Sequence, residues 1–135
     1  MFAEGPYGAF TSNRAQRKVL LIGGGVGITP VRALLEELRG DVVAVYRANQ
    51  WEDTVLANEL RYLAERTGAR LHMAVGPPDG WLLSAAHLVS LVPDVRDRNV
   101  FVCGPPGMTD AVLATLRELA VPADQCHTER FAFAA

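Results

Sequence analysis

Short strand-like runs, most of them apolar, alternate with amphipathic segments along this chain. Three of these runs are followed directly by glycine, as buried strands that end in tight turns often are. Between the runs, apolar residues recur at three- and four-residue spacing, which is typical of a helix with one buried face. The predicted strands are residues 18–22, 42–46, 70–75, 99–103 and 125–129.

The segments between these strands carry helix start and stop signals. The apolar face of the first predicted helix consists of Val31, Leu34, Leu35 and Leu38, and that of the second of Leu56, Leu60, Leu63 and Ala64. The last helix turns Val112, Leu116 and Leu119 inward. Candidate N-caps are Thr29 before Pro30, Asp53 or Thr54, Ser84, and Thr109 or Asp110. Gly40, Gly68 and Pro93 are predicted to end the first three helices.

Regular alternation of strand and helix predicts an α/β fold of the doubly wound, Rossmann-like class. Five parallel strands would form one open sheet with helices on both faces. The strand at residues 70–75 begins with polar side chains and is therefore expected near an edge. Residues 1–11 lack this pattern and resemble the tail of another domain, joined through a polar stretch at residues 12–17.

Composition excludes several classes of function. The chain of 135 residues is 50% apolar and 21% charged, with a formal net charge of −2, so no basic surface for nucleic acid or anionic lipid is expected. No apolar run is long enough to cross a bilayer, and no secretory leader opens the chain. The two cysteines, Cys103 and Cys126, are too few for a disulfide scaffold or a structural zinc site. We expect reduced thiols, no metal and a cytoplasmic location.

Glycines cluster where the first strand meets the first helix. In an open parallel sheet, ligands bind at the carboxyl ends of the strands. Glycines at this point let the backbone approach a pyrophosphate, and the following helix presents its positive dipole end. Gly23 and Gly25 have the dinucleotide-binding spacing, although Ile28 replaces the third glycine. A tight turn without ligand is the alternative interpretation.

The end of the second strand bears on the choice of cofactor. An NAD-binding fingerprint has an acidic residue about 20 positions after the glycines. Arg47 occupies that place, and a guanidinium suits a 2′-phosphate better than a hydroxyl. This favours NADP(H) over NAD(H). The alternative is a solvated charge at the end of a strand.

Four motifs in order identify a family resemblance. They are Gly5-Pro6-Tyr7-Gly8-x-Phe10, residues 23–30, Cys103-Gly104-Pro105-Pro106-Gly107-Met108, and His127-x-Glu129-Arg130-Phe131-Ala132-Phe133. Together they resemble the ferredoxin–NADP reductase superfamily, most closely its ferric-reductase and NADPH-oxidase branch. The resemblance covers essentially the whole chain. It implies an NAD(P)-binding domain at residues 15–135 and, at residues 1–14, the end and linker of a missing FAD-binding β-barrel.

The resemblance also implies roles for individual residues. The cofactor-binding set would be Gly24, Gly25, Val26, Gly27, Ile28, Thr29, Pro30, Arg47, Cys103, Gly104, Pro105 and Met108. Arg47 would lie beside the 2′-phosphate; many relatives have a second arginine where this chain has Asn49. Cys103 would lie beside the nicotinamide, where its soft sulfur could position the ring carbon that gives up hydride. A buried strand-end cysteine is the alternative.

The C-terminal segment is aromatic. The resemblance places Phe131 against the flavin, with Glu129 as a nearby carboxylate, so that Cys103, Glu129 and Phe131 form the predicted catalytic set. Phe131 and Phe133 could instead pack on this domain's own last helix, and His127 is interpreted as a strand residue.

The resulting hypothesis is an NAD(P)H-dependent flavoprotein oxidoreductase. Hydride would pass to FAD on the separate barrel domain and then to haem, iron or a protein acceptor, so the isolated chain would not be active alone. A haem-bearing transmembrane domain is a further expected partner, with this domain on the cytosolic face. A non-catalytic dinucleotide sensor is the alternative, and a purely structural domain ranks below it.

Overall fold

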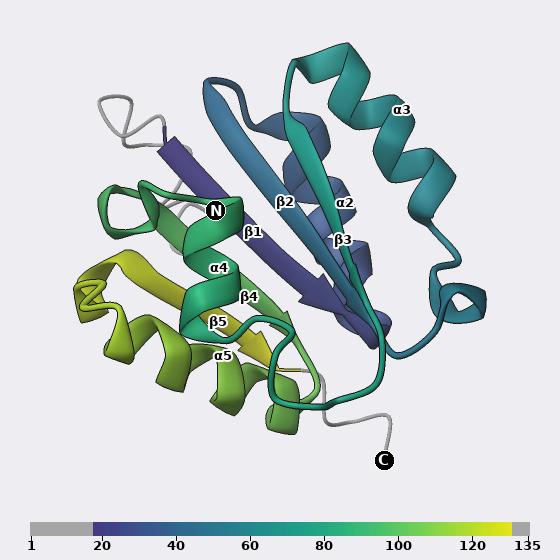
Figure 1. Cartoon of the computed structure of the whole chain (residues 1–135). Helices are drawn as coiled ribbons and strands as arrows, with labels where there is room; N and C mark the ends of the chain where they lie inside the picture. The colour runs from purple at the N-terminus through teal and green to yellow at the C-terminus, as the bar shows by residue number, and fades with distance from the viewer. Residues whose placement is uncertain (1–17, 131–135) are drawn as a thin grey trace.

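A computed structural model describes residues 18–130, in which five parallel strands form one twisted sheet (Figure 1). The strands are β1 Lys18–Gly24, β2 Asp41–Ala48, β3 Arg70–Val75, β4 Asn99–Gly104 and β5 Cys126–Arg130. Their spatial order is β3-β2-β1-β4-β5, so the chain moves outward on one side of β1 and then crosses to the other side. The predicted doubly wound α/β class is confirmed, and β3 is an edge strand as its polar start predicted.

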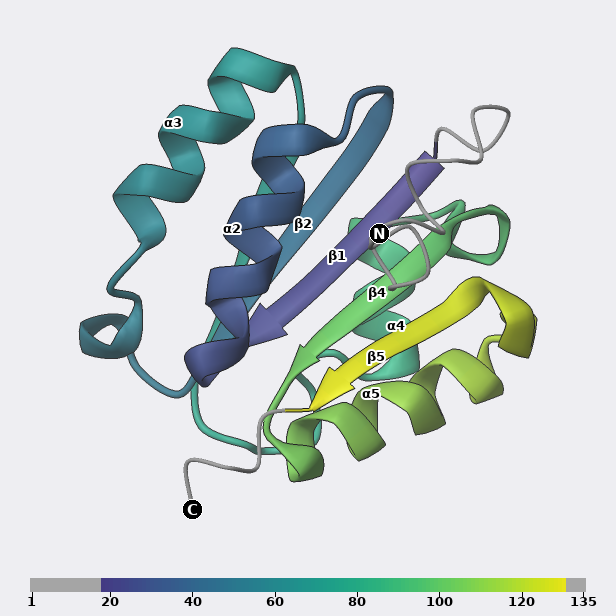
Figure 2. The same ribbon diagram turned by 180° about the vertical axis from the view of Figure 1, so that it is seen from behind.

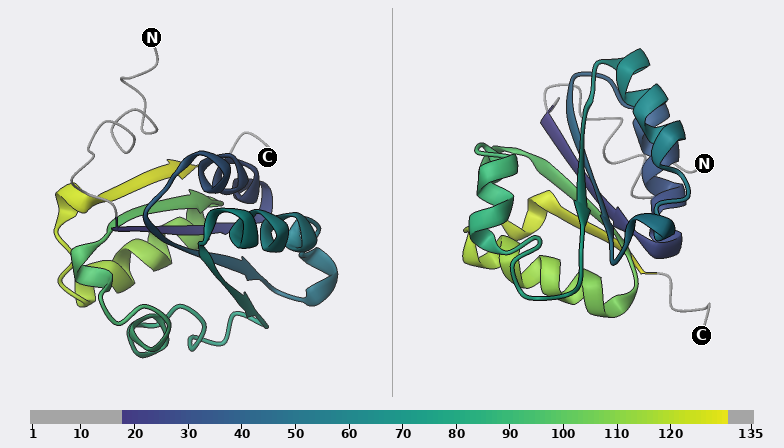
Figure 3. Two further views of the ribbon diagram at one scale, coloured as in Figure 1. Left: turned by 90° about the horizontal axis from the view of Figure 1, so that it is seen from above. Right: turned by 45° about the vertical axis from the view of Figure 1, so that its right-hand side comes forward.

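Two helices cover each face of the sheet (Figures 2 and 3). The helices α2 Ile28–Glu37 and α3 Ala57–Thr67 lie on one face, and α4 Ala85–Leu91 and α5 Pro106–Glu118 lie on the other. This division follows from right-handed crossovers on the two sides of β1. Across residues 18–130, none of the helices combines the length and the apolar character needed to cross a membrane.

Each face of the sheet has its own apolar core, and β1 contributes to both. Val19 and Leu21 pack with α2 and α3, whereas Leu20 and Ile22 pack with α4 and α5. All four side chains are at most 3% exposed. Successive strand residues point to opposite faces. A strand covered on both faces therefore reads as an unbroken apolar run, which is why β1 could be predicted.

The N-caps predicted for three of the helices are wrong. The helices concerned begin at Ile28, Ala57 and Pro106 without a side-chain cap. Thr29 lies inside α2, because the short 3₁₀ turn η2 (Gly25–Gly27) already leads the chain into the helix. Thr54 Oγ1 instead donates to Trp51 O at 2.6 Å and closes the 3₁₀ turn η3 (Trp51–Asp53). Thr109 is buried, and its hydroxyl donates to Gly104 O at 3.3 Å. The alternatives Asp53 and Asp110 do not cap either helix.

Three of the remaining helix-boundary predictions are confirmed, and one is wrong. Ser84 caps α4 by accepting a hydrogen bond from the backbone N–H of His87. Gly68 ends α3 with φ +80°, in the left-handed region where glycine costs less than other residues, and α4 ends at Leu91, shortly before Pro93. Gly40 does not end α2, because the helix already ends at Glu37 and Leu38 is extended with ψ +146°.

A buried arginine joins the amino ends of the central strands. Arg98 is 1% exposed, and its Nη1 donates to the carbonyl oxygens of Val19 at 3.0 Å and Asp41 at 2.8 Å. Its Nη2 reaches Asp41 Oδ1, and its Nε reaches Asp94 Oδ1, both at 2.9 Å. Hydrogen bonds from Arg98 and then Lys18 lower the pKa of Asp94 to about 2. This charge network ties together β1, β2 and the turn before β4.

We predict that Arg98→Gln lowers the free energy of unfolding by about 3 kcal/mol, because it removes the buried donor of two strand-end carbonyls and leaves Asp41 and Asp94 only their more exposed partners Arg70 and Lys18. Arg70→Gln is the matched control: Arg70 Nη2 also bonds Asp41 Oδ1 at 2.9 Å, but its side chain is 56% exposed. Its loss should be below about 1 kcal/mol. Urea unfolding of both variants checks this, and equal losses would contradict the role assigned to Arg98.

The same network predicts an acid limit to stability. The folded-state pKa of Asp94 is about 2, below its ordinary value of 3.8. Its stabilising contribution should therefore be complete above about pH 4 and decline as the pH falls toward 2. Unfolding midpoints of the natural chain and Asp94→Asn measured across this range should converge at the acid end. A constant difference would count against the ion pair.

Candidate functional site

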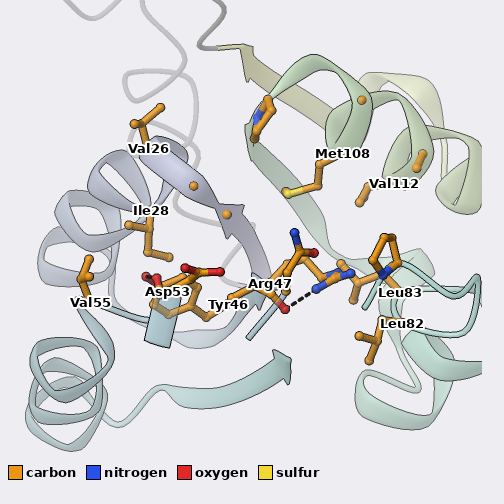
Figure 4. A pocket seen from close by; sticks show the side chains of 18 of the residues that line it. Val26, Ile28, Tyr46, Arg47, Asp53, Val55, Leu82, Leu83, Met108 and Val112 are labelled. Atoms are coloured by element: carbon orange, nitrogen blue, oxygen red, sulfur yellow. Dashed lines mark hydrogen bonds between the residues drawn. The ribbon is translucent and has the colours of Figure 1, made fainter. Parts of the chain in front are cut away.

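The carboxyl ends of the strands enclose a large pocket (Figure 4). Its volume is about 1050 Å³, at the upper end of the range for small-molecule and cofactor sites. Residues that follow β1, β2, β3 and β4 all contribute to its wall. Because β1 lies between β2 and β4, the helices after β1 and β4 start on opposite faces of the sheet, and the pocket lies at this switch point.

Most of the predicted cofactor-binding residues meet in this pocket. Those on the wall are Gly24, Gly25, Val26, Ile28, Thr29, Arg47, Pro105 and Met108. Four others do not line the pocket: Gly27, Pro30, Cys103 and Gly104. The thiol of Cys103 is fully buried and packs in the core cluster under α2. Its predicted place beside a nicotinamide ring therefore stays a prediction.

The predicted catalytic residues of the C-terminal segment are only partly described. The backbone of Glu129 lies on β5, in register with Cys103 on β4. Phe131 and Phe133 lie outside the described residues. His127 lies on β5, as predicted, and burial lowers its pKa below the ordinary value.

Two glycines set the depth of the pocket floor. A Cβ atom on Gly27 would overlap the backbone of Cys103 and Gly104, so the start of α2 rests directly on the end of β4. A Cβ atom on Gly24 would lie 2.7 Å from Met108 Sδ and 2.8 Å from Arg47 O, which is too close for either contact. Both missing side chains thus serve close packing: Gly27 lets the start of α2 contact β4, and Gly24 lets Met108 and the carbonyl group of Arg47 approach the end of β1. A ligand-binding role for this glycine turn stays a prediction.

The rim next to this floor is open to solvent. Gly25, Val26 and Thr29 are exposed, and all three line the pocket. They immediately precede or begin α2, whose amino end carries the positive end of the helix dipole. The arrangement fits a negatively charged group bound between this turn and Pro105 on the opposite loop.

Arg47 points across the pocket toward the loop that follows β3 (Figure 4). Its Nη1 donates to Gly76 O at 3.0 Å and Ala74 O at 3.4 Å, and also to Ala48 O. Burial lowers the pKa of Arg47, an effect that Asp79 opposes. The side chain therefore lines the pocket while it also fastens the β3–α4 loop to the end of β2.

Two carboxylates were missed by the sequence analysis. Glu52 and Asp53 both line the pocket, and Figure 4 shows Asp53 beside Tyr46 and Ile28. The expected position of an acid was directly after residue 46, but β2 continues to Ala48 and the turn η3 then brings the acids back over the pocket. The acids stand in the connection between the second strand and its helix, which is the signal in the sequence that points to them.

Most of the remaining wall is apolar, and few of its residues could be assigned to the site from the sequence. These residues are Val55, Leu56, Pro78, Leu82, Leu83, Ala111 and Val112. Figure 4 shows Ile28 and Val55 on one side of the pocket and Leu82, Leu83 and Val112 on the other. Among the described residues, no group of three or more His, Cys, Asp or Glu side chains could hold a metal ion. The site therefore offers a polar floor, an apolar wall and both signs of charge.

A parallel sheet with a glycine turn and a pocket at its switch point defines a dinucleotide-binding domain. The chain belongs to the family of oxidoreductase NAD-binding domains, whose model matches residues 21–114. The fold is that of the NAD(P)-binding domain of the ferredoxin–NADP reductase type.

Relatives of known function are reductases. The chain is 34% identical to the ferredoxin–NAD(+) reductase component of an alkene monooxygenase system from Xanthobacter autotrophicus, over 95% of this chain and 43% of the relative. It is 32% identical to the ferredoxin reductase component of a 3-ketosteroid-9-alpha-monooxygenase from Rhodococcus rhodochrous, over 93% and 37%. The chain thus spans about two fifths of these relatives.

Solved structures share the fold. A flavohemoglobin from Malassezia yamatoensis, determined with bound FAD and haem, superposes with a TM-score of 0.73 at 21% identity. The match covers 89% of this chain and 33% of that one. A ferredoxin reductase of carbazole 1,9a-dioxygenase gives a TM-score of 0.64 at 24% identity, over 85% and 35%.

We predict that Gly27→Ala costs about 2–3 kcal/mol of stability and weakens dinucleotide binding, because the added methyl group must displace the start of α2 from β4. Gly107→Ala is the matched control, since a Cβ atom there meets nothing within 4 Å and Gly107 lies inside α5. That change should leave stability equal or slightly higher. Thermal unfolding compares the stability of the two variants, and calorimetric titration with NADH compares Gly27→Ala with the natural chain, because Gly107 itself lines the pocket. A tolerated Gly27→Ala would contradict the close contact.

Proposed function

We propose that this domain binds NAD(P)H and presents it to FAD held by a separate FAD-binding domain, from which electrons pass to haem, iron or a protein acceptor. The observation that carries the proposal is the glycine-floored pocket at the switch point of the sheet, beside the amino end of α2. Membership of the oxidoreductase NAD-binding family supports it. So do relatives that are reductase components of oxygenase systems.

Different residues of the pocket would bind different parts of the cofactor. Gly25, Val26 and Thr29 would receive the pyrophosphate, because they offer backbone groups at the positive end of α2 without large side chains in the way. Pro105 and Met108, after β4, would border the nicotinamide. Bound NAD(P)H supplies the hydride; the protein supplies orientation and excludes water with its apolar wall.

The choice between NADH and NADPH depends on which charges act at the adenosine 2′ position: the positive charge of Arg47 or the negative charges of Glu52 and Asp53. The sequence favoured NADP(H) because Arg47 replaces the usual acid. In the pocket, however, Arg47 is bonded to three carbonyl oxygens, and the two carboxylates would repel a 2′-phosphate and accept hydrogen bonds from a ribose hydroxyl. We therefore propose that NADH is preferred, with the NADP(H) preference as the alternative. An NADH-cytochrome b5 reductase-like relative from Emericella nidulans, 29% identical over 81% of this chain and 26% of its own length, supports NADH.

The partner domains and the location of this domain are also proposals. We propose a FAD-binding barrel as its partner, as the motif at residues 5–8 predicts. A haem-bearing transmembrane domain, a cytoplasmic location and a place in the ferric-reductase and NADPH-oxidase branch stay predictions from the sequence. The competing sensor hypothesis predicts dinucleotide binding without flavin reduction, so single-turnover reduction of FAD by NADH in the presence of the barrel domain distinguishes the two.

We predict tighter binding of NADH than of NADPH. The double change Glu52→Gln with Asp53→Asn should improve NADPH affinity by about tenfold, or about 1.4 kcal/mol, and change NADH affinity far less, because it removes two negative charges near the 2′ position. Calorimetric titration of both cofactors measures this. If Arg47→Ala weakens NADPH selectively while the double variant changes nothing, the alternative preference is correct.

We predict that Cys103→Ala slows hydride transfer to FAD by about tenfold with little change in NADH affinity, because the family resemblance places the thiol beside the nicotinamide ring. A thiol that only packs in the core, where the structure buries it, would instead affect stability and leave the rate unchanged. Stopped-flow bleaching of the flavin, with the barrel domain present, gives the rate. Cys126→Ala is the matched control, since Cys126 lies at the amino end of β5, away from the pocket. An unchanged rate in Cys103→Ala would remove Cys103 from the mechanism.

A further inference from the structure

One wall of the pocket contains a strained residue. Leu83 has φ +62°, in the left-handed region that branched side chains rarely adopt. Among the non-glycine residues in the described range 18–130, Ala120 is the other with positive φ, and it lies just after α5. Leu83 instead lies in the connection between β3 and α4, with its side chain 5% exposed. Such a conformation persists only when neighbouring groups enforce it.

Two side chains hold the backbone of Leu83 from behind. Its N–H donates to His87 Nδ1 at 3.0 Å, and its carbonyl oxygen accepts from Thr115 Oγ1 at 2.9 Å. The backbone of His87 is held in turn, because its N–H donates to Ser84 Oγ at 3.3 Å. Both polar groups of the Leu83 backbone are thus held by residues of α4 and α5 that do not line the pocket.

The held segment is part of the cofactor pocket. Pro78, Gly80, Leu82 and Leu83 all line the pocket. Leu82 and Leu83 lie on the side opposite Ile28 and Val55 (Figure 4). We propose that His87 and Thr115 are positioning residues: by fixing the left-handed conformation of Leu83, they set this wall in the place where it contacts the bound dinucleotide. The inference rests on the proposed function, since it assigns the cofactor to this pocket.

The test is calorimetric titration of the 135-residue chain with NADH, at a temperature where every variant is folded. His87→Leu removes the acceptor and Thr115→Val removes the donor; each should weaken NADH binding by about three- to tenfold. The matched variants His87→Asn and Thr115→Ser keep an acceptor oxygen and a hydroxyl, and should remain within about twofold of the natural chain. Thr115→Val also serves if His87→Leu does not fold.

The conservative variants separate positioning from simple stabilisation. Lower melting temperatures in His87→Leu and Thr115→Val with unchanged NADH affinity would overturn the positioning role, as would NADH binding by His87→Asn and Thr115→Ser that is as weak as in the variants lacking the bond. Absence of NADH and NADPH binding by the natural chain would overturn the proposed function itself.

Discussion

The architecture depends on the contact between Gly27 and the backbone of Cys103 and Gly104. No other residue could bring the first turn of α2 directly onto the end of β4, because any side chain would overlap the carbonyl group there. This contact places the amino end of the helix over the junction of β1 and β4, where the direction of winding reverses. Gly25 and Val26, which come just before Gly27, are exposed on the pocket wall, so a charged linker could reach the helix dipole there.

The two ends of the sheet differ: the amino ends of the strands are closed by side chains, and the carboxyl ends surround an open pocket. At the amino ends, Arg98 satisfies strand carbonyls and carboxylates with one buried guanidinium, so this end is closed. At the carboxyl ends, four connections separate and leave about 1050 Å³ of space. A sheet that is fastened at one end can keep an open pocket at the other, because the strands cannot splay apart. The pocket wall then needs only local supports, and the bonds to Leu83 and Arg47 are of this kind.

Sequence reasoning succeeded where one physical cause dominates. Burial on both faces makes β1 continuously apolar, so this strand could be predicted. The end of α3 could be predicted because Gly68 follows it in the left-handed conformation that glycine favours. It failed where two local solutions compete. Thr54 was a sensible cap, yet its hydroxyl closes a 3₁₀ turn instead. In the site, the glycine turn and the motif after β4 were found because glycine and proline mark them, whereas Glu52 and Asp53 depend on how far β2 extends.

The same limit explains why Arg47 alone is a weak basis for choosing a cofactor. An arginine binds a phosphate through donors that are free to face it. Here Nη1 of the guanidinium already bonds carbonyl oxygens at the ends of β2 and β3, and two carboxylates share the pocket. A 2′-phosphate would have to compete for the arginine and also tolerate the negative charge opposite. The residue type indicates what an arginine can bind, but its hydrogen bonds and its neighbours decide what it does bind.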